Sequence, residues 1–225
     1  MSWRNFFIVD RTSRASDRYP AIYYEDIAKA IAAQIPAPGA VVLDYACGAA
    51  PAASLIAEHC ATVYLYDPTP KMQTILRQRY AANPKIKILN EAQVRALPDE
   101  TLDMVLFNGL FQYLTLAQCT EAVDFAAAKL RLGGRLVVAD VIPPHADPLS
   151  DSWALVEYAY RGGFLLAALR GALSRSRPLR RRIALTTFTI PDMQRLLATH
   201  GFETRRADRN IGHNQMHMTF LAKRV

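Results

Sequence analysis

A turn of small residues after an acidic residue is the feature of this chain that most directly indicates chemistry. The apolar residues 41–43 lead into Asp44, and five of the six residues that follow it are small. A short apolar run that ends in turn residues and precedes a helical segment is typical of a buried parallel strand. Small side chains let a ligand approach the backbone, and Gly48 can adopt backbone angles that other residues disfavour. We therefore expect a ligand to bind at this turn.

A second acidic residue indicates what kind of ligand binds there. The strand-like residues 62–66 end at Asp67, about twenty residues beyond the turn. A carboxylate at the end of the second strand can accept hydrogen bonds from both hydroxyls of a ribose. Asp44, Gly48 and Asp67 together predict a site for a nucleoside-containing cofactor. A structural role, in which Asp67 caps the turn beside Pro68, stays open at this point.

Two classes of nucleoside cofactor compete for this pattern. A dinucleotide site has a G-x-G-x-x-G turn, in which the N-terminus of a helix holds the pyrophosphate. Of those three glycines the turn has only Gly48, and nothing beside it offers a phosphate cradle. The turn therefore argues against a dinucleotide.

The segment from Asp44 to Ala50 resembles the first motif of the class I S-adenosylmethionine-dependent methyltransferases. That motif is an acidic residue followed by G-x-G-x-G. Asp44 stands at the acidic position and Gly48 at the central glycine. Ala46 and Ala50 stand where the family usually has glycine.

Three further segments extend this resemblance over most of the chain, in the order that the family has them. Residues 97–108, LPDETLDMVLFN, resemble the segment that leads into the fourth strand. Residues 130–138, LRLGGRLVV, are similar to the family's L-K-P-G-G segment, and residues 188–202 to its F-T-x-x-E-L…L-x-x-A-G-F. The resemblance implies an α/β fold with a Rossmann-like, seven-stranded, mostly parallel sheet that ends in an antiparallel hairpin.

The alternation of strand-like and helix-like segments predicts the same α/β class from the residues themselves. Strands are expected at residues 41–46, 62–67, 86–90, 103–108, 135–142, 203–209 and 216–223. Helices are expected at residues 20–35, 50–59, 71–82, 115–131 and 191–200. Gly133 and Gly134 stand where a helix C-cap and the turn into the fifth strand belong.

The resemblance implies that S-adenosylmethionine is the cofactor and that methyl transfer is the activity. By that resemblance Asp44 and Gly48 would hold the methionyl end, and Asp67 would bind the ribose. Glu91 would accept the amino hydrogens of the adenine, and Asn108 would lie near the sulfonium. The full set of cofactor-binding residues implied is Asp44, Ala46, Cys47, Gly48, Asp67, Pro68, Met72, Glu91, Ala92, Gln93 and Asn108.

The catalytic base is harder to predict, because in-line methyl transfer requires alignment above all and proton removal only for some acceptors. Tyr113 stands where relatives often have a histidine, and His145 follows the fifth strand. These two residues are the candidates, although Tyr113 could simply pack against the cofactor. His213 and His217 lie in the final hairpin, where a histidine is more often exposed or part of the core.

Residues 143–188 interrupt the strand and helix rhythm, and we expect them to form a helical lid insertion within one domain that spans residues 1–225. The insertion contains the aromatic residues Trp153, Tyr158, Tyr160 and Phe164 and the basic residues Arg170, Arg175, Arg177, Arg180, Arg181 and Arg182. A helix with an aliphatic face beside clustered arginines can also lie on an anionic membrane. A substrate lid is the preferred reading, and peripheral membrane contact is the alternative.

Composition narrows the remaining choices. A formal net charge of +7 permits an acidic partner, a nucleic acid or an anionic membrane. Three widely spaced cysteines without metal-ligand spacing favour a reducing, cytoplasmic setting, and no metal is expected.

The sequence predicts methyl transfer to a small, apolar or lipid-like molecule. A non-catalytic binding protein of the same fold and an RNA methyltransferase are the alternatives, and the tetrapeptide at residues 108–111 lacks the N-P-P-Y pattern used for nucleobase amines.

Overall fold

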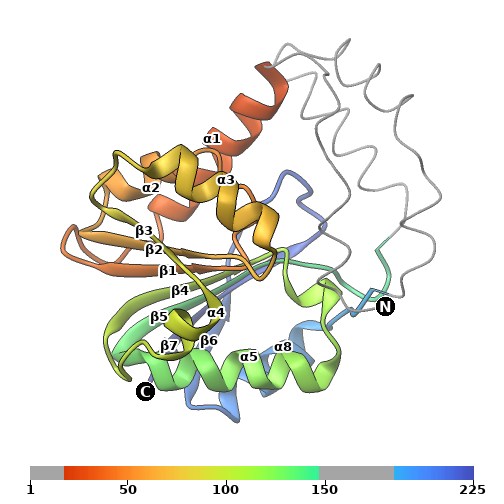
Figure 1. Ribbon diagram of the computed structural model, residues 1–225. Coiled ribbons are helices and arrows are strands. Elements are labelled where there is room, and N and C mark those ends of the chain that lie inside the picture. The colour runs from red at the N-terminus through yellow and green to blue at the C-terminus, as the bar shows by residue number, and fades with distance from the viewer. Residues whose placement is uncertain (1–17, 147–184) are drawn as a thin grey trace.

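The computed structural model describes residues 18–146 and 185–225, which form one layered α/β unit. A twisted central sheet lies between two layers of helices (Figure 1). Helices α1, α2 and α3 cover one face of the sheet, and α4, α5 and α8 cover the other. This arrangement leaves the carboxyl ends of the parallel strands along one edge, where ligands bind in folds of this kind.

The sheet has seven strands in the order β3-β2-β1-β4-β5-β7-β6. The strands are β1 (Val41–Tyr45), β2 (Thr62–Tyr66), β3 (Ile86–Leu89), β4 (Leu102–Asn108), β5 (Leu130–Val141), β6 (Phe202–Arg206) and β7 (Met218–Arg224). Strands β1 to β5 pair in parallel, whereas β7 runs antiparallel to both β5 and β6. The predicted Rossmann-like sheet with an antiparallel last hairpin is confirmed.

Side-chain caps set the starts of some of the helices. The helices are α1 (Arg18–Ala32), α2 (Ala53–Glu58), α3 (Pro70–Tyr80), α4 (Glu91–Arg95), α5 (Leu116–Lys129) and α8 (Ile190–Ala198), with a short 3-10 helix, η2, at Phe111–Tyr113. Thr115 caps α5, because its side chain accepts a hydrogen bond from the Gln118 N–H while the Gln118 side chain accepts one from Thr115 N. Thr189 likewise caps α8 by accepting from Asp192 N at 3.2 Å.

The expectation that Gly133 and Gly134 end a helix is wrong. Helix α5 ends at Lys129, and β5 begins at once with Leu130. Both glycines lie inside β5 at a register shift against β4, and Gly133 has a φ of +76°. A Cβ on Gly134 would lie 2.8 Å from the Arg131 carbonyl oxygen, so only glycine fits. The pair marks an irregularity in the strand rather than a helix cap.

The core consists of two apolar layers, one on each face of the sheet. On one side, strand residues such as Val105 and Phe107 pack with α5 and α8 through Val123 and Leu197. On the other side, Val63, Leu106 and their neighbours pack with α1, α2 and α3. Because the central strands are buried on both faces, they read as near-continuous apolar runs, and this is why the sequence located them.

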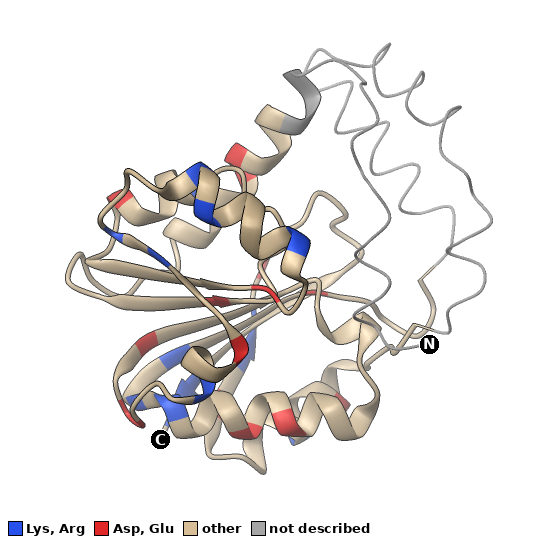
Figure 2. Ribbon diagram, viewed as in Figure 1, with Lys and Arg blue, Asp and Glu red and all other residues tan. Residues whose placement is uncertain are grey.

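The charges of the protein are spread over several surfaces (Figure 2). At the amino ends of β4 and β5, basic side chains have acidic partners. The pairs are Lys129 with Asp99 at 2.7 Å, Arg131 with Asp103 at 2.5 Å and Arg224 with Glu100 at 3.0 Å. The positive charge of this described region is therefore neutralised locally.

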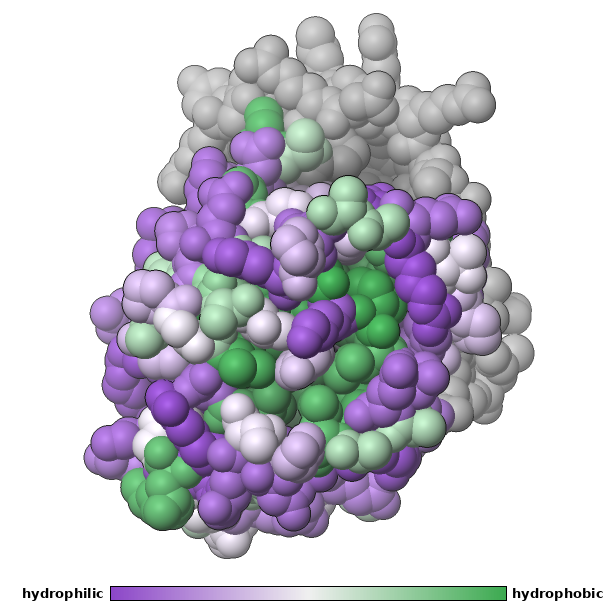
Figure 3. Space-filling view, turned by 60° about the vertical axis from the view of Figure 1, so that its left-hand side comes forward, coloured by the Kyte–Doolittle hydropathy of each residue, from purple (hydrophilic) through white to green (hydrophobic). Residues whose placement is uncertain are grey.

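Hydrophobic side chains reach the surface on the side shown in Figure 3, where hydrophilic residues surround them. Within residues 18–146 and 185–225, no helix is both long and apolar enough to cross a membrane.

The predicted lid insertion, residues 143–188, is described only at its two ends. Residues 147–184 lie outside the described structure, and with them lie all the aromatic and arginine residues that the membrane and lid predictions use. The two ends lie side by side, because Phe188 N donates to Ile142 O at 3.0 Å. Thr186 N donates to Gln112 O of η2 at 3.0 Å, which holds the second end beside the residues that follow β4. The segment therefore leaves and rejoins the domain at the carboxyl end of β5, beside the turn that follows β4.

Candidate active site

The small-residue turn and Asp67 meet at the carboxyl ends of β1 and β2. These strands pair in register, and Cys47 N extends the pairing beyond β1 by donating to Tyr66 O at 3.0 Å. Gly48 N then donates to Asp67 Oδ2 at 3.0 Å. The two motif regions that the sequence placed in one site are therefore joined directly.

Asp67 is fully buried and has several partners within the chain. Its Oδ1 accepts hydrogen bonds from Thr69 N at 2.9 Å and from Thr69 Oγ1 at 2.6 Å. With Gly48 N on Oδ2, three of the roughly four lone-pair positions of a carboxylate are used. Asp67 thus caps the turn, as the structural alternative requires, and by this count one lone-pair position remains on Oδ2. Its role toward ribose stays a prediction.

Asp44 lies on β1 beside this carboxylate and is also buried. Burial, and then the charge of Asp67, raise the pKa of Asp44 from its ordinary 3.8 to about 7. The same two causes, with the Asp44 charge added, raise the pKa of the Cys47 thiol, which is therefore a neutral side chain at this turn. A cationic group that binds beside Asp44 would restore its charged form.

The turn has the backbone of a glycine-rich loop even where its residues are alanine. The φ angles are 61° at Ala46, 61° at Gly48 and 35° at Ala50. For a residue with a Cβ the left-handed region costs roughly 1–2 kcal/mol. A Cβ added to Gly48 would meet nothing within 4 Å, so the space over the centre of the turn is open to a ligand. The turn therefore fits the nucleoside cofactor that the sequence predicts.

Two residues at the end of α3 hold this strained turn. The Tyr80 hydroxyl donates to Ala50 O and accepts from Ala53 N at 3.1 Å. Arg79 Nη1 donates to Ala49 O. The tyrosine is almost fully buried, so its hydroxyl is a fixed anchor for the start of α2.

Helix α4 carries the residues predicted to meet the adenine. Asn90 and Gln93 form a capping box, in which Gln93 N donates to Asn90 Oδ1 and Gln93 Oε1 accepts from Asn90 N. Glu91 pairs with Arg95 at 3.1 Å, and Ala92 is exposed. The backbone N–H of Gln93 is thus engaged within the helix. Of the three residues predicted to meet the adenine, Glu91 and Ala92 are therefore the ones whose contact with it is to be tested.

Other predicted residues surround the same edge of the sheet. Pro68 and Met72 are half-buried at the start of α3, and Asn108 ends β4 in register with Ala139. Tyr113 is half-buried in η2, directly after β4. His145 lies exposed in the turn after β5. No contact in the described structure assigns either of the last two a catalytic role, which stays a prediction.

Asp140 is the residue of this edge that sequence reasoning missed. It follows the apolar run at residues 136–139 near the end of β5, just as Asp44 and Asp67 follow theirs. His217 Nδ1 lies 2.8 Å from Asp140 Oδ1. The signal was a third acidic residue at the end of a parallel strand, next to the strand that ends in Asn108.

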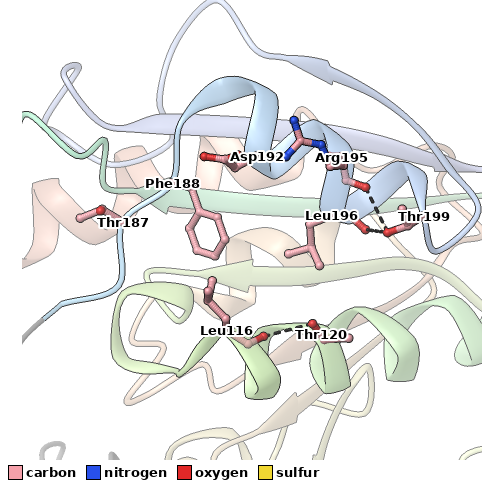
Figure 4. Close-up of a pocket in the computed structure, with 8 residues that line it drawn as sticks. All are labelled: Leu116, Thr120, Thr187, Phe188, Asp192, Arg195, Leu196 and Thr199. Atoms are coloured by element: carbon pink, nitrogen blue, oxygen red, sulfur yellow. Dashed lines mark hydrogen bonds and ion pairs between the residues drawn. The ribbon is translucent and has the colours of Figure 1, made fainter.

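A separate pocket lies between α5 and α8 (Figure 4). It is lined by Leu116, Thr120, Thr187, Phe188, Asp192, Arg195, Leu196 and Thr199. None of these residues belongs to the predicted cofactor or catalytic set, so this pocket is not the candidate site.

Comparisons with known proteins agree with this geometry. Residues 42–134 match a family model described as a methyltransferase domain. An uncharacterized methyltransferase of Anoxybacillus flavithermus is 26% identical over 164 residues, which are 73% of this chain and 70% of the relative.

Several solved structures match nearly the whole chain, and among them are two methyltransferases with a bound cofactor or its product. A magnesium protoporphyrin IX methyltransferase from Synechocystis, with bound SAH, is 15% identical, has a TM-score of 0.59, and the match covers 99% of this chain and 93% of that one. An amino pentose methyltransferase from Micromonospora echinaspora, with bound SAM, is 19% identical, has a TM-score of 0.63, and the match covers 93% of this chain and 98% of that one. Residues 42–134 therefore match a methyltransferase domain, and the chain has the fold of solved methyltransferases that bind S-adenosylmethionine or S-adenosylhomocysteine.

Proposed function

We propose that this methyltransferase transfers the methyl group of S-adenosylmethionine to a small molecule of apolar or lipid-like character. The observation that carries the proposal is the hydrogen bond between Gly48 N and Asp67 Oδ2, which joins both parts of the nucleoside site beneath an open turn. Two of the solved structures that match nearly end to end are named for an amino pentose and a magnesium protoporphyrin, which are both small molecules.

The residues of the site have distinct tasks in this function. When bound, the cofactor supplies an electrophilic methyl group on a sulfonium sulfur. Asp67 would hold the ribose, and the turn around Gly48 would admit the methionyl part to the backbone. Asn108 ends β4 and Gly109 follows it, at the place where the reacting groups have to be aligned. In-line methyl transfer mainly requires the protein to orient the cofactor and the acceptor, and the residues at the carboxyl edge of the sheet would do this.

The non-catalytic alternative was based on Ala46 and Ala50. Both alanines keep positive φ angles, so the loop retains the conformation that glycines would give it. This observation supports a working cofactor site rather than a degenerate one.

The alternative function, RNA methylation, was based on the positive net charge of the chain. The basic residues Lys129, Arg131 and Arg224 are neutralised by acidic partners, which argues against this surface as a phosphate-binding patch. For the small-molecule methyltransferase we also propose a cytoplasmic location, because its three cysteines are free and two of them are buried.

Titration calorimetry with S-adenosylmethionine, S-adenosylhomocysteine and NAD tests the cofactor part. We expect binding of the first two and none of NAD. A filter assay with methyl-labelled cofactor, in which a small-molecule cell extract and total RNA are compared as acceptors, tests the acceptor class. Label that is transferred to RNA and not to the extract would overturn the proposal.

A further inference from the structure

Asp140 lies beside the end of β4 in a strained conformation. Its φ is 59°, a value that a residue with a Cβ seldom adopts. The preceding Ala139 pairs with Asn108, and Gly109 N donates to Ala139 O at 3.0 Å. The carboxylate is thereby held next to the strand end where we place methyl transfer. Strained residues of this kind are concentrated at functional sites.

Residues from the final hairpin hold one oxygen of this carboxylate. Asp140 Oδ1 lies 2.8 Å from His217 Nδ1 and accepts from Asn210 Nδ2 at 3.1 Å. Asp140 N donates back to Asn210 Oδ1 at 3.1 Å, and the Thr219 hydroxyl also donates to that amide oxygen at 2.8 Å. Asn210, His217 and Thr219 are buried, so Oδ1 belongs to a fixed network.

The second oxygen faces the other way. A Cβ built on Gly212 would lie 2.8 Å from Asp140 Oδ1, whereas one built on Gly109 would lie 3.5 Å from Oδ2. Glycines thus flank the carboxylate on both sides, and Oδ2 is directed toward the end of β4. The Asp140 side chain is 27% exposed and that of His217 only 6%, so the acidic side chain is the accessible member of the pair.

The network also determines the charge of Asp140. Burial by itself raises the pKa of this carboxyl, but the hydrogen bond and charge of His217, the hydrogen bond of Asn210 and the charge of His213 together hold it below its ordinary value. Asp140 is therefore an anion at neutral pH, with one oxygen directed at the reaction edge.

We propose that Asp140 is an acceptor-side carboxylate of this methyltransferase, whose Oδ2 accepts a hydrogen bond from an N–H or O–H group placed at the methyl-transfer position. His217 and Asn210 are positioning residues, because they hold Oδ1 and so direct Oδ2. The acceptor class is then an amine or a hydroxyl compound, with an anionic contact at its reacting atom. This inference rests on the cofactor site proposed above. A purely structural tie between β5 and the hairpin would use Oδ1 alone.

Sinefungin provides a probe that does not require the acceptor to be known. This analogue of S-adenosylmethionine has a carbon with an amino group in place of the methylated sulfur, so its ammonium donates hydrogen bonds from the methyl-transfer position. S-adenosylhomocysteine lacks that donor. We expect the wild-type protein to bind sinefungin about tenfold or more tightly than S-adenosylhomocysteine, since a hydrogen bond to a charged group typically contributes that much.

Asp140→Asn should remove most of this preference and change the Kd of S-adenosylhomocysteine by less than about threefold. Asp208→Asn, which removes an exposed acidic residue of the same region, is the matched control and should keep the preference. His217→Gln should reduce the preference partly, because the charge stays and its orientation loosens. This second variant also serves if Asp140→Asn does not fold.

Two results would overturn the inference. One is a wild-type protein without a preference for sinefungin, and the other is an unchanged preference in folded Asp140→Asn and His217→Gln. In both cases S-adenosylhomocysteine still binds, so the proposed function stands. If the wild-type protein bound neither compound, the proposed function would fail first and this inference with it.

Discussion

The carboxyl edge of the sheet has two halves that use acidic residues in different ways. In the cofactor half, Asp67 is held by the backbone N–H groups of Gly48 and Thr69 and by the Thr69 hydroxyl, and its charge acts on the neighbouring Asp44. In the acceptor half, Asp140 is held by the side chains of His217 and Asn210. Both halves also contain residues with a Cβ and a positive φ, Ala46 and Ala50 in one and Asp140 in the other.

The partners of each acidic residue explain the difference in charge. Burial and a second carboxylate raise the pKa of Asp44 to about 7. An imidazole and an amide overcome the same effect of burial and lower the pKa of Asp140. The cofactor half can therefore take up a proton near neutral pH, whereas the acceptor half stays anionic. The nature of the partner, more than the depth of burial, decides the state of a carboxylate here.

The pH dependence of stability tests this contrast most strongly. For Asp44 the folded pKa lies above the unfolded value, so the folded state binds more protons between pH 4 and 7. The free energy of unfolding therefore falls as pH rises through this range, by up to about 4 kcal/mol, and is level above it. The measurement is urea unfolding of the ligand-free wild type and of Asp44→Asn from pH 4 to 8, with the difference between the two plotted against pH.

Asp140 should show the opposite sign. Its folded pKa is lowered, so it contributes stability above its unfolded pKa that is lost as pH falls through the folded one. The difference between wild type and Asp140→Asn should thus be level above about pH 4 and shrink below it. Equal pH profiles for the two variants would mean that the halves do not differ in charge.

The next largest effect is expected on cofactor affinity. Asp67→Asn removes the charge from the predicted ribose acceptor and keeps an oxygen for Thr69. Loss of a hydrogen bond to a charged group costs roughly 1.5–3 kcal/mol, so calorimetry should show about tenfold to more than a hundredfold weaker S-adenosylhomocysteine binding. Glu121→Gln, on the exposed face of α5, is the control. Unchanged affinity would leave Asp67 as a turn cap alone.

The cofactor half was predictable from the sequence because its parts are local. The acidic residue, the small turn and the next strand lie within about 25 residues, and buried parallel strands stand out as apolar runs. Strands β1 to β4 accordingly lie within a residue or two of their expected bounds. Helix α4 was not foreseen, since five residues are too few to show helical periodicity.

The acceptor half could not be predicted in this way. Asn210 and His217 lie 70 and 77 residues from Asp140 along the chain, and only the antiparallel return of β7 beside β5 brings them together. The start of β5 was missed for a related reason. Gly133 and Gly134 look like a helix end locally, and the pairing with β4 that makes them part of a strand is not local.

Tyr80→Phe tests whether the cofactor half depends on help from α3. The variant removes the donor to Ala50 O and one of the two acceptors of Ala53 N, which keeps its hydrogen bond to Ala50 O. A hydrogen bond of this type contributes about 1 kcal/mol, and the variant loses both hydrogen bonds of the Tyr80 hydroxyl. We expect a loss of about 1–2 kcal/mol in the free energy of unfolding and weaker S-adenosylhomocysteine binding. Tyr64→Phe, a half-buried tyrosine on β2, should affect neither to the same degree.

The smallest expected effect is a change in Tm, and its sign tests whether the turn of the cofactor half is strained. Ala46→Gly should stabilise the protein, because glycine adopts the 61° φ of this position without the strain of roughly 1–2 kcal/mol that alanine bears. Part of that gain is offset by about 0.4–1 kcal/mol, since glycine has more freedom in the unfolded chain. The net effect is a rise in Tm of roughly 1–4 °C for a chain of this size. Ala117→Gly, on the exposed side of α5, is the control. It increases the conformational entropy of the unfolded chain in the same way but relieves no strain, so it should lower Tm by about as much as Ala46→Gly raises it. A drop in Tm for Ala46→Gly as large as that for Ala117→Gly would show that the alanine turn is not strained, and that the backbone of the cofactor half is set by its hydrogen bonds alone.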